Sequence, residues 1–158
     1  MFNKAIIAYD HRVDKKYVEK IKEVLNTKSI EFCEVLNAEE GNDYPLIAKE
    51  AYNKYQQNKA NLLILLCGTG VGMNIVANKF DGICSVLPAD EATAYFARRD
   101  EDANCIVFAA GKADENHEVK LCRRKMARML NTFIDTQFMG EERHLRRINQ
   151  IRDIEKGN

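Results

Sequence analysis

Short apolar runs alternate with amphipathic stretches along most of this 158-residue chain. Residues 5–8 and 62–66 are uniformly apolar, with no polar alternation. Such runs are typical of strands buried on both faces of a parallel sheet. Residues 14–25 instead repeat their apolar positions at the spacing of an amphipathic helix. The pattern therefore predicts that strands and helices alternate from the first residues onward.

The rest of the chain continues this alternation. Further strands are predicted at residues 30–36, 83–87 and 105–109, and further helices at 45–55, 73–79, 90–99, 118–130 and about 142–155. Five strands separated by helices favour βαβ units, and hence an α/β fold with a five-stranded parallel sheet covered on both faces. No linker or repeat divides the chain, so we expect one domain over residues 1–158. The last helix follows a break at Gly140 and has a thin apolar stripe, so we expect it to pack on a partner subunit.

Composition and charge narrow the class of protein. The 24 Lys and Arg balance 24 Asp and Glu, and 46% of residues are hydrophobic, as in ordinary soluble domains. No apolar run approaches the ~18 residues of a membrane span. The first residues lack the apolar region of a signal peptide, so we expect a cytoplasmic protein without a membrane partner. Residues 120–158 hold ten basic and five acidic residues. The zero net charge and the lack of interleaved aromatic and basic residues nevertheless argue against a nucleic-acid partner.

A glycine-rich loop follows the most apolar run and is the clearest chemical signal in the sequence. Its residues are Gly68, Thr69, Gly70, Val71 and Gly72. Three glycines in five residues let backbone N–H groups approach an anion closely, next to the start of a helix. The spacing is neither the dinucleotide-binding fingerprint nor a P-loop. The alternative interpretation is a tight turn that binds nothing.

Cys67 directly precedes this loop. A thiol beside backbone N–H groups can act as a base or a nucleophile, and a buried structural cysteine is the equally ordinary alternative. The other four cysteines lie in apolar strand-like or helical runs, and we interpret them as structural. The cysteines and the three histidines lack the spacing of metal ligands, so we expect no bound metal.

Two further groups of polar residues are candidate anion contacts. Asp10 and His11 follow the first strand, where an imidazole can contact a phosphate or a sugar hydroxyl. Arg143 and Arg147 are four residues apart, so they share one face of the last helix, with His144 adjacent. Two guanidinium groups on one face suit a phosphate. A turn and a solvated charged helix explain the same residues without a ligand.

The segment CGTGVGMNIVANK at residues 67–79 resembles the signature of the ribose-5-phosphate isomerase type B family, which includes the galactose-6-phosphate isomerase subunits. Supporting matches, in family order over nearly the whole chain, are Asp10-His11, Asp43-Tyr44-Pro45, Asp102-Ala103-Asn104, and Arg143-His144 with Arg147. The resemblance implies a Rossmann-like three-layer α/β/α sandwich. It also implies a homodimer or a dimer of dimers whose active sites are shared between subunits.

The resemblance further implies cofactor-free aldose–ketose isomerisation of a sugar phosphate, ribose 5-phosphate to ribulose 5-phosphate in the first instance. Cys67 matches the base that moves a proton between C1 and C2, and Thr69 matches a residue near that proton. The matches imply substrate-binding roles as well: Gly68, Gly70, Val71 and Gly72 for the enediolate oxygens, His11, Arg143 and Arg147 for the phosphate, and Asp10, Asp43, Tyr44 and His144 for the rest of the pocket.

Two positions depart from the family pattern. Asp100 and Glu101 stand where family isomerases carry a His-Asn pair, and that histidine helps to open the sugar ring. We expect Asp100 to relay the ring-opening proton and Glu101 to lie beside the substrate. An acid at this position also resembles one type of galactose-6-phosphate isomerase subunit. A hexose 6-phosphate of the galactose or allose type therefore remains an alternative substrate, and a non-catalytic phosphosugar-binding module an alternative function.

Overall fold

The computed structural model describes residues 1–36, 43–112 and 121–157 of the chain. The elements in these ranges are β1 (Lys4–Tyr9), α1 (Lys15–Thr27), β2 (Glu31–Leu36), α2 (Tyr44–Gln57), β3 (Leu62–Cys67), α3 (Val71–Ala77), β4 (Ser85–Val86), α4 (Glu91–Arg99), β5 (Cys105–Ala109), α5 (Arg123–Asp135) and α6 (Glu142–Glu155). Within these ranges no helix has both the length and the apolar character needed to cross a bilayer.

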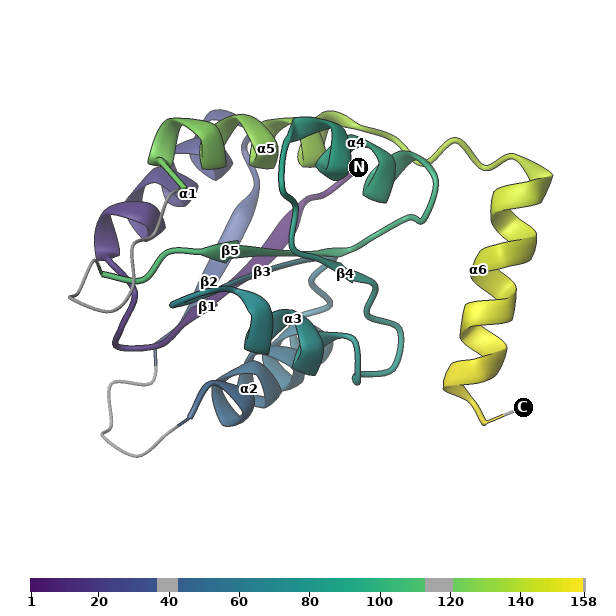
Figure 1. The fold of residues 1–158 in the computed structure, drawn as a ribbon, viewed down its shortest axis with the longest axis horizontal. Helices are drawn as coiled ribbons and strands as arrows, with labels where there is room; N and C mark the ends of the chain where they lie inside the picture. The colour runs from purple at the N-terminus through teal and green to yellow at the C-terminus, as the bar shows by residue number, and fades with distance from the viewer. Residues whose placement is uncertain (37–42, 113–120, 158) are drawn as a thin grey trace.

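The five strands form one parallel sheet in the order β2-β1-β3-β5-β4. Figure 1 shows α1, α4 and α5 on one face of this sheet and α2 and α3 on the other. This three-layer α/β/α arrangement confirms the predicted fold class. After β1 the chain adds β2 on one side and β3 on the other, so the connections reverse direction between β1 and β3. Ligands of such folds bind at this point, outside the carboxyl ends of the strands.

The central strands are buried on both faces, as their uniform apolar sequence predicts. All six residues of β3 are buried, and each side chain contributes to one of two apolar clusters. Leu62, Ile64 and Leu66 pack under α1, α4 and α5, while Leu63 and Leu65 pack under α2 and α3. Burial of one such side chain contributes roughly 1.5–3 kcal/mol. The carboxyl end of β3 is therefore held on a rigid support.

Helix starts follow the capping signals of the sequence. The Asp14 side chain accepts a hydrogen bond from the backbone N–H of Lys16 at 3.0 Å and begins α1. The Asp90 side chain accepts from the backbone N–H of Thr93 at 2.7 Å and begins α4, and this bond lowers the pKa of Asp90. Such caps stabilise a helix by about 1 kcal/mol. Both helices begin within one residue of the predicted position.

The strand predicted at residues 83–87 is shorter in the structure, where β4 contains only Ser85 and Val86. Side chains replace the sheet hydrogen bonds on either side of this short edge strand. The Asn78 side chain binds both the N–H and the carbonyl of Ser85, at 2.9 and 3.0 Å. The Asn104 side chain accepts from the backbone N–H of Cys84 at 2.9 Å. Sequence periodicity does not reveal these long-range partners.

Two predicted helix ranges are also corrected. We predicted a helix over residues 118–130, but α5 runs from Arg123 to Asp135, and residues 118–120 lie outside the described part. The helix continues because Phe133 is fully buried in the core beyond the predicted end. The helix predicted through Lys79 ends at Ala77, since the side chain of Asn78 turns back to the carbonyl of Asn74 at 3.0 Å.

Helix α6 stands apart from the three layers (Figure 1), beyond the edge strand β4. It is tied back by the Glu155 side chain, which accepts from the backbone N–H of Gly82 at 2.7 Å. A groove of about 330 Å³ separates α6 from the body and is partly lined by Ile148 and Ile151. Ile151 and Ile154 remain 51% and 74% exposed. The apolar face of α6 is thus only partly covered within one chain.

Candidate active site

Cys67 is the last residue of β3 and lies at the carboxyl end of the sheet, beside Ala109 of β5. It is 4% exposed. The backbone N–H of Gly70 donates a hydrogen bond to the Cys67 sulfur at 3.1 Å. A donor aimed at sulfur stabilises negative charge on that atom. The local geometry therefore places a backbone donor directly against the sulfur.

Close packing fixes the position of the Gly70 N–H group. Gly70 has φ of +77°, and a Cβ there would lie 2.6 Å from Leu87 Cδ1 and 3.2 Å from the backbone nitrogen of Ala109. At Gly72 a Cβ would lie 2.6 Å from a ring carbon of Tyr44. Gly70 requires glycine because of its φ and the nearby backbone, whereas a side chain at Gly72 would have to displace the Tyr44 ring. The loop is therefore packed closely against β5 and against the start of α2.

The opposite side of the loop is open to solvent. Thr69 and Val71 are exposed, and Gly68 is half-buried. Gly68 is held from behind by Gly111, whose backbone N–H donates to the Gly68 carbonyl at 3.2 Å. Gly68, Thr69 and Val71 therefore form an accessible surface next to Cys67, whereas Gly70 is buried behind them.

Asp10 lies beside Cys67 at the same edge, because Tyr9 and Leu66, the residues just before them, are partners in the β1–β3 register. Asp10 is only 1% exposed. Its carboxylate accepts three hydrogen bonds from Arg12: backbone N to Oδ1 at 2.9 Å, and Nη2 and Nε to Oδ2 at 2.7 and 3.2 Å. Arg12 is a site residue that our sequence analysis missed. Its one signal is its position two residues after Asp10.

The segment after β1 is anchored to the segment after β5. Val13 forms a bridge with Gly111, and the Lys112 ammonium donates to the carbonyl of His11 at 3.2 Å. The His11 side chain is exposed. His11 therefore lies at the rim of the same edge, and its contact with a phosphate stays a prediction.

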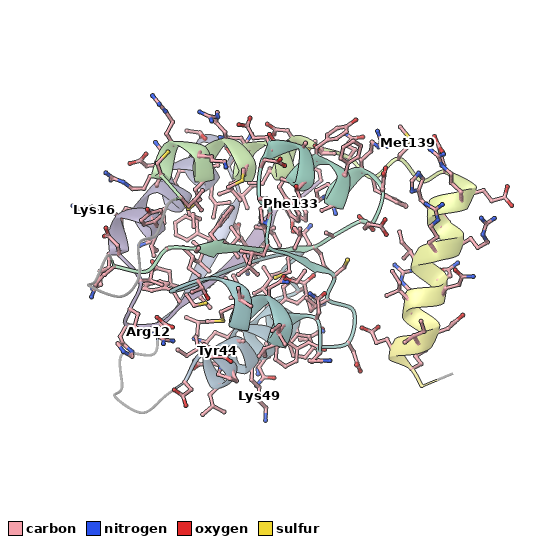
Figure 2. All side chains as sticks on the ribbon, viewed as in Figure 1. Arg12, Lys16, Tyr44, Lys49, Phe133 and Met139 are labelled. Carbon is pink, nitrogen blue, oxygen red and sulfur yellow. The ribbon has the colours of Figure 1, made fainter. Side chains whose placement is uncertain are left out.

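The start of α2 closes another side of this region. Tyr44 is the first residue of α2, and its ring covers Gly72. Asp43 precedes it and makes no capping hydrogen bond with its side chain, so the carboxylate is not used by the helix. Figure 2 labels Arg12 and Tyr44, which lie at the same end of the molecule. Hydrogen bonding to Asp10 raises the pKa of Arg12, and the charges of Asp10, Cys67 and Asp43 add to the rise.

The remaining predicted site residues form a second group around the start of α6. His144 is 2% exposed, and its Nε2 lies 3.8 Å from Asp100 Oδ1 and accepts from Arg143 Nε at 3.1 Å. The Nδ1 atom of His144 is buried and has no hydrogen-bond partner among the described residues. Arg143 and Arg147 are exposed, and Glu101 is half-buried. Arg143 and Asp100 therefore lie against one buried histidine, and the Glu141 carboxylate is 3.7 Å from its Nε2.

Asp100 is bound by its own neighbour. Arg99 donates to the Asp100 carboxylate through Nε at 2.6 Å and Nη2 at 3.1 Å. These bonds lower the pKa of Asp100, and the charges of Arg99, His144 and Arg143 add to the decrease. A carboxylate held in this way is a weaker proton acceptor than a free one. The structure thus makes Asp100 a poorer candidate for proton relay than its sequence position indicates.

Within one chain, the residues around Cys67 and the residues around His144 lie far apart. Cys67 pairs with Ala109 at the carboxyl end of β5, whereas Asp100 precedes the other end of that strand. The four residue steps along β5 alone span roughly 13 Å. Figure 1 shows α6 at the end of the molecule opposite the carboxyl ends of the strands, and in Figure 2 Met139, just before α6, lies far from Arg12.

Three of the other cysteines differ in their surroundings. Burial raises the pKa of Cys105 to about 12 and also raises the pKa of Cys84. Cys122 corrects our interpretation, because it is exposed at the start of α5 and not part of an apolar run. Backbone N–H groups of Lys125 and Arg124 lower its pKa. In residues 1–36, 43–112 and 121–157 no cluster of three His, Cys, Asp or Glu is placed to hold a metal ion.

Comparisons with known proteins agree with this arrangement. Residues 5–151 match the ribose/galactose isomerase family. A putative sugar phosphate isomerase from Bacillus subtilis is 32% identical over 98% of this chain and 99% of its own length. A probable ribose-5-phosphate isomerase B from Mycoplasma pneumoniae is 35% identical over 69% of this chain and 66% of its own length. A crystal structure of a Thermotoga maritima ribose 5-phosphate isomerase matches with a TM-score of 0.80 and 34% identity, covering 96% of this chain and 98% of that one.

Together these relatives identify the protein as an aldose–ketose isomerase that acts on sugar phosphates. The chain belongs to the ribose/galactose isomerase family, since the match spans most of its length.

Proposed function

We propose that this protein interconverts ribose 5-phosphate and ribulose 5-phosphate, with Cys67 as the base. The Cys67 thiolate takes the proton from C2 of the open-chain aldose, which leaves an enediolate and a neutral thiol. The hydroxyl proton passes from O2 to O1, and the thiol returns its proton to C1 as the C2 carbonyl forms, which gives the ketose and regenerates the thiolate. No bond to sulfur forms, and the steps need no cofactor.

The observation that carries this proposal is the hydrogen bond from the Gly70 N–H to the Cys67 sulfur at 3.1 Å, at the open edge of the sheet. A general base contributes typically ~10²–10⁴-fold to a rate. Loop N–H groups that face the substrate provide preorganised donors for the enediolate oxygens, where loss of one donor can cost ~10²-fold or more. Thr69 is exposed beside the sulfur and suits the role of a neighbour to the transferred proton.

The five-carbon substrate is supported by relatives that cover nearly the whole chain. Solved structures described as ribose 5-phosphate isomerases align with 96–99% of it, including those from Thermotoga maritima and Trypanosoma cruzi. A galactose-6-phosphate isomerase subunit from Clostridium acetobutylicum is 43% identical, but over only 40% of this chain. The acid at position 100 is the observation that favours a hexose 6-phosphate instead.

Deuterium exchange at C2 distinguishes these substrates. We expect incorporation from D₂O into ribose 5-phosphate, measured by NMR, and at least ~10-fold slower exchange with allose or galactose 6-phosphate, because a pocket that fits one sugar discriminates by this order. Faster exchange with a hexose 6-phosphate would reassign the substrate and keep the mechanism. Binding of these sugars without any exchange would contradict the isomerase proposal and support the phosphosugar-binding module.

We also propose that two chains form a homodimer in which Arg143, Arg147 and their neighbours on one chain complete the Cys67 site of the other. The separation of the two groups within one chain supports this arrangement. So does the exposed apolar side of α6, where Leu145, Ile151 and Ile154 are 45–74% exposed. In a symmetric dimer the same surfaces meet twice, so two equivalent sites result.

Mixing two inactive variants tests the shared site. Cys67→Ala and the double variant Arg143→Met/Arg147→Met are each expected to be inactive alone. If sites are shared, each mixed dimer regains one intact site, so random reassembly restores about a quarter of the wild-type rate. Each variant mixed with itself is the control. No recovery in a mixture shown to contain mixed dimers would contradict shared sites.

A further inference from the structure

A buried carboxylate lies next to the thiol that we propose as the base. Asp10 is 1% exposed and directly follows Tyr9, whose register partner Leu66 directly precedes Cys67. Two negative charges placed side by side away from water oppose each other strongly. Without compensation, an ionised Asp10 would make the Cys67 thiol hold its proton more tightly.

Arg12 provides the compensating charge. Its Nη2 and Nε both bind Oδ2 of Asp10, at 2.7 and 3.2 Å, and its own backbone N–H binds Oδ1 at 2.9 Å. The planar guanidinium therefore fixes the direction of the carboxylate as well as neutralising it. The charges of Cys67 and Asp43 also act on Arg12, which places the guanidinium within their electrostatic reach.

Other ionisable groups at this edge have different partners or positions. The Lys112 ammonium binds the carbonyl of His11, and the His11 ring is exposed. Asp43 and Tyr44 approach from the start of α2, with the Tyr44 ring against Gly72. In the described part of the chain, Arg12 is the cation that hydrogen-bonds Asp10.

We propose that Arg12 is a positioning residue of the isomerisation and acts through Asp10, whose carboxylate it neutralises and orients beside the Cys67 thiol. The inference rests on the proposed function, in which Cys67 is the base. Arg12 moves no proton itself. It lets the thiolate form beside a carboxylate, and it keeps Asp10 in a fixed direction at the end of β1.

A cycle of variants at Arg12 and Asp10 tests the coupling. Arg12→Met is expected to raise the midpoint of Cys67 ionisation by about one pH unit or more. Arg12→Lys, which keeps the charge, is expected to rescue most of that rise. Adding Asp10→Asn to Arg12→Met is expected to reverse it, because both charges are then gone. The readout is the ultraviolet absorbance of the thiolate against pH, taken as the difference between each protein and the same protein carrying Cys67→Ala.

The matched control is Arg128→Met, which removes an arginine bound to Glu91 at 2.7 Å between α5 and α4, on the opposite face of the sheet from the Cys67 cluster. It should leave the Cys67 midpoint unchanged. An unchanged midpoint in folded Arg12→Met, or a rise that persists after Asp10→Asn, would overturn the inference. If Arg12→Met does not fold, the Arg12→Lys and Asp10→Asn proteins still report the coupling, since Asp10→Asn alone should lower the midpoint.

Activity separates this inference from the proposed function. Arg12→Met is expected to lower kcat/KM about tenfold near neutral pH and to recover at higher pH, in step with the thiolate titration. The absorbance midpoints could shift as expected while no protein, wild type included, isomerises the sugar. That result would uphold the Arg12–Asp10–Cys67 coupling and reject the proposed function. Full activity in Cys67→Ala would reject the base assignment on its own.

Discussion

Replacement of Cys67 by alanine is expected to stop exchange of the C2 hydrogen of ribose 5-phosphate and to lower kcat by ~10³-fold or more. A general base alone is typically worth ~10²–10⁴-fold, and alanine also removes the group that the Gly70 N–H contacts. Binding of the sugar phosphate should change little, because the binding groups remain. The measurement is C2 exchange by NMR together with the affinity of the same sugar.

Cys122→Ala is the control for this experiment. Cys122 is exposed, and backbone N–H groups lower its pKa, so it is the other thiol with an ionisable character. It lies at the start of α5, away from the glycine-rich loop, and its replacement should leave the exchange rate unchanged. Exchange that persists in Cys67→Ala and disappears in Cys122→Ala would move the base to the other thiol. Cys67→Ser is a stricter test, since a hydroxyl at the same place ionises far less readily.

The fold can be predicted from local sequence because its central strands are compatible with few arrangements. A run such as residues 62–66 can be satisfied only by burial on both faces, and that requires a parallel sheet with helices on either side. The limits of the prediction lie at elements whose hydrogen bonds go to distant side chains. β4 is short because Asn78 and Asn104 bind the backbone around it, and no local periodicity contains that information.

The candidate site could be predicted where its reactive residues are contiguous in the chain. Cys67 and its glycine-rich loop are contiguous, so the loop alone indicates an anion or a developing negative charge beside a thiol. Arg12 was not predictable in the same way, because its role depends on the burial of Asp10 and on the register of β1 with β3. The resemblance to a family identified Asp100 by position, but the Arg99 contact that lowers its pKa appears only in the structure.

The features of the candidate site that the sequence did not reveal share one physical cause. A motif specifies residues that are close in sequence, whereas the charge state of a site depends on every group that the fold brings near. Asp10 and Cys67 are brought near each other where two strands end. Arg99 and Asp100 are adjacent in sequence, but the direction of their side chains, and so their contact, depends on the fold around them. The residues that do the chemistry are easier to recognise in a sequence than the residues that set their charge state.

Gly70→Ala is expected to destabilise the protein and to impair catalysis together. The φ of +77° costs an alanine ~1–2 kcal/mol. Its Cβ would also lie 2.6 Å from Leu87 Cδ1 and 3.2 Å from the Ala109 backbone nitrogen, and overpacking typically adds ~1–3 kcal/mol. The expected loss in the free energy of unfolding is therefore about 2–5 kcal/mol. C2 exchange by the folded variant should fall ~10²-fold, because the shifted N–H no longer meets the Cys67 sulfur.

Gly82→Ala separates these two effects. Gly82 has φ of +74° but open space around the Cβ position, so alanine there carries only the conformational cost of ~1–2 kcal/mol. Urea unfolding of both variants, with C2 exchange measured well below the transition, provides the comparison. Equal destabilisation of the two proteins with full exchange in Gly70→Ala would contradict the argument. The expected difference in the free energy of unfolding between the two variants measures how much packing against β5 stabilises the loop. That packing places the Gly70 N–H at the Cys67 sulfur before the substrate binds.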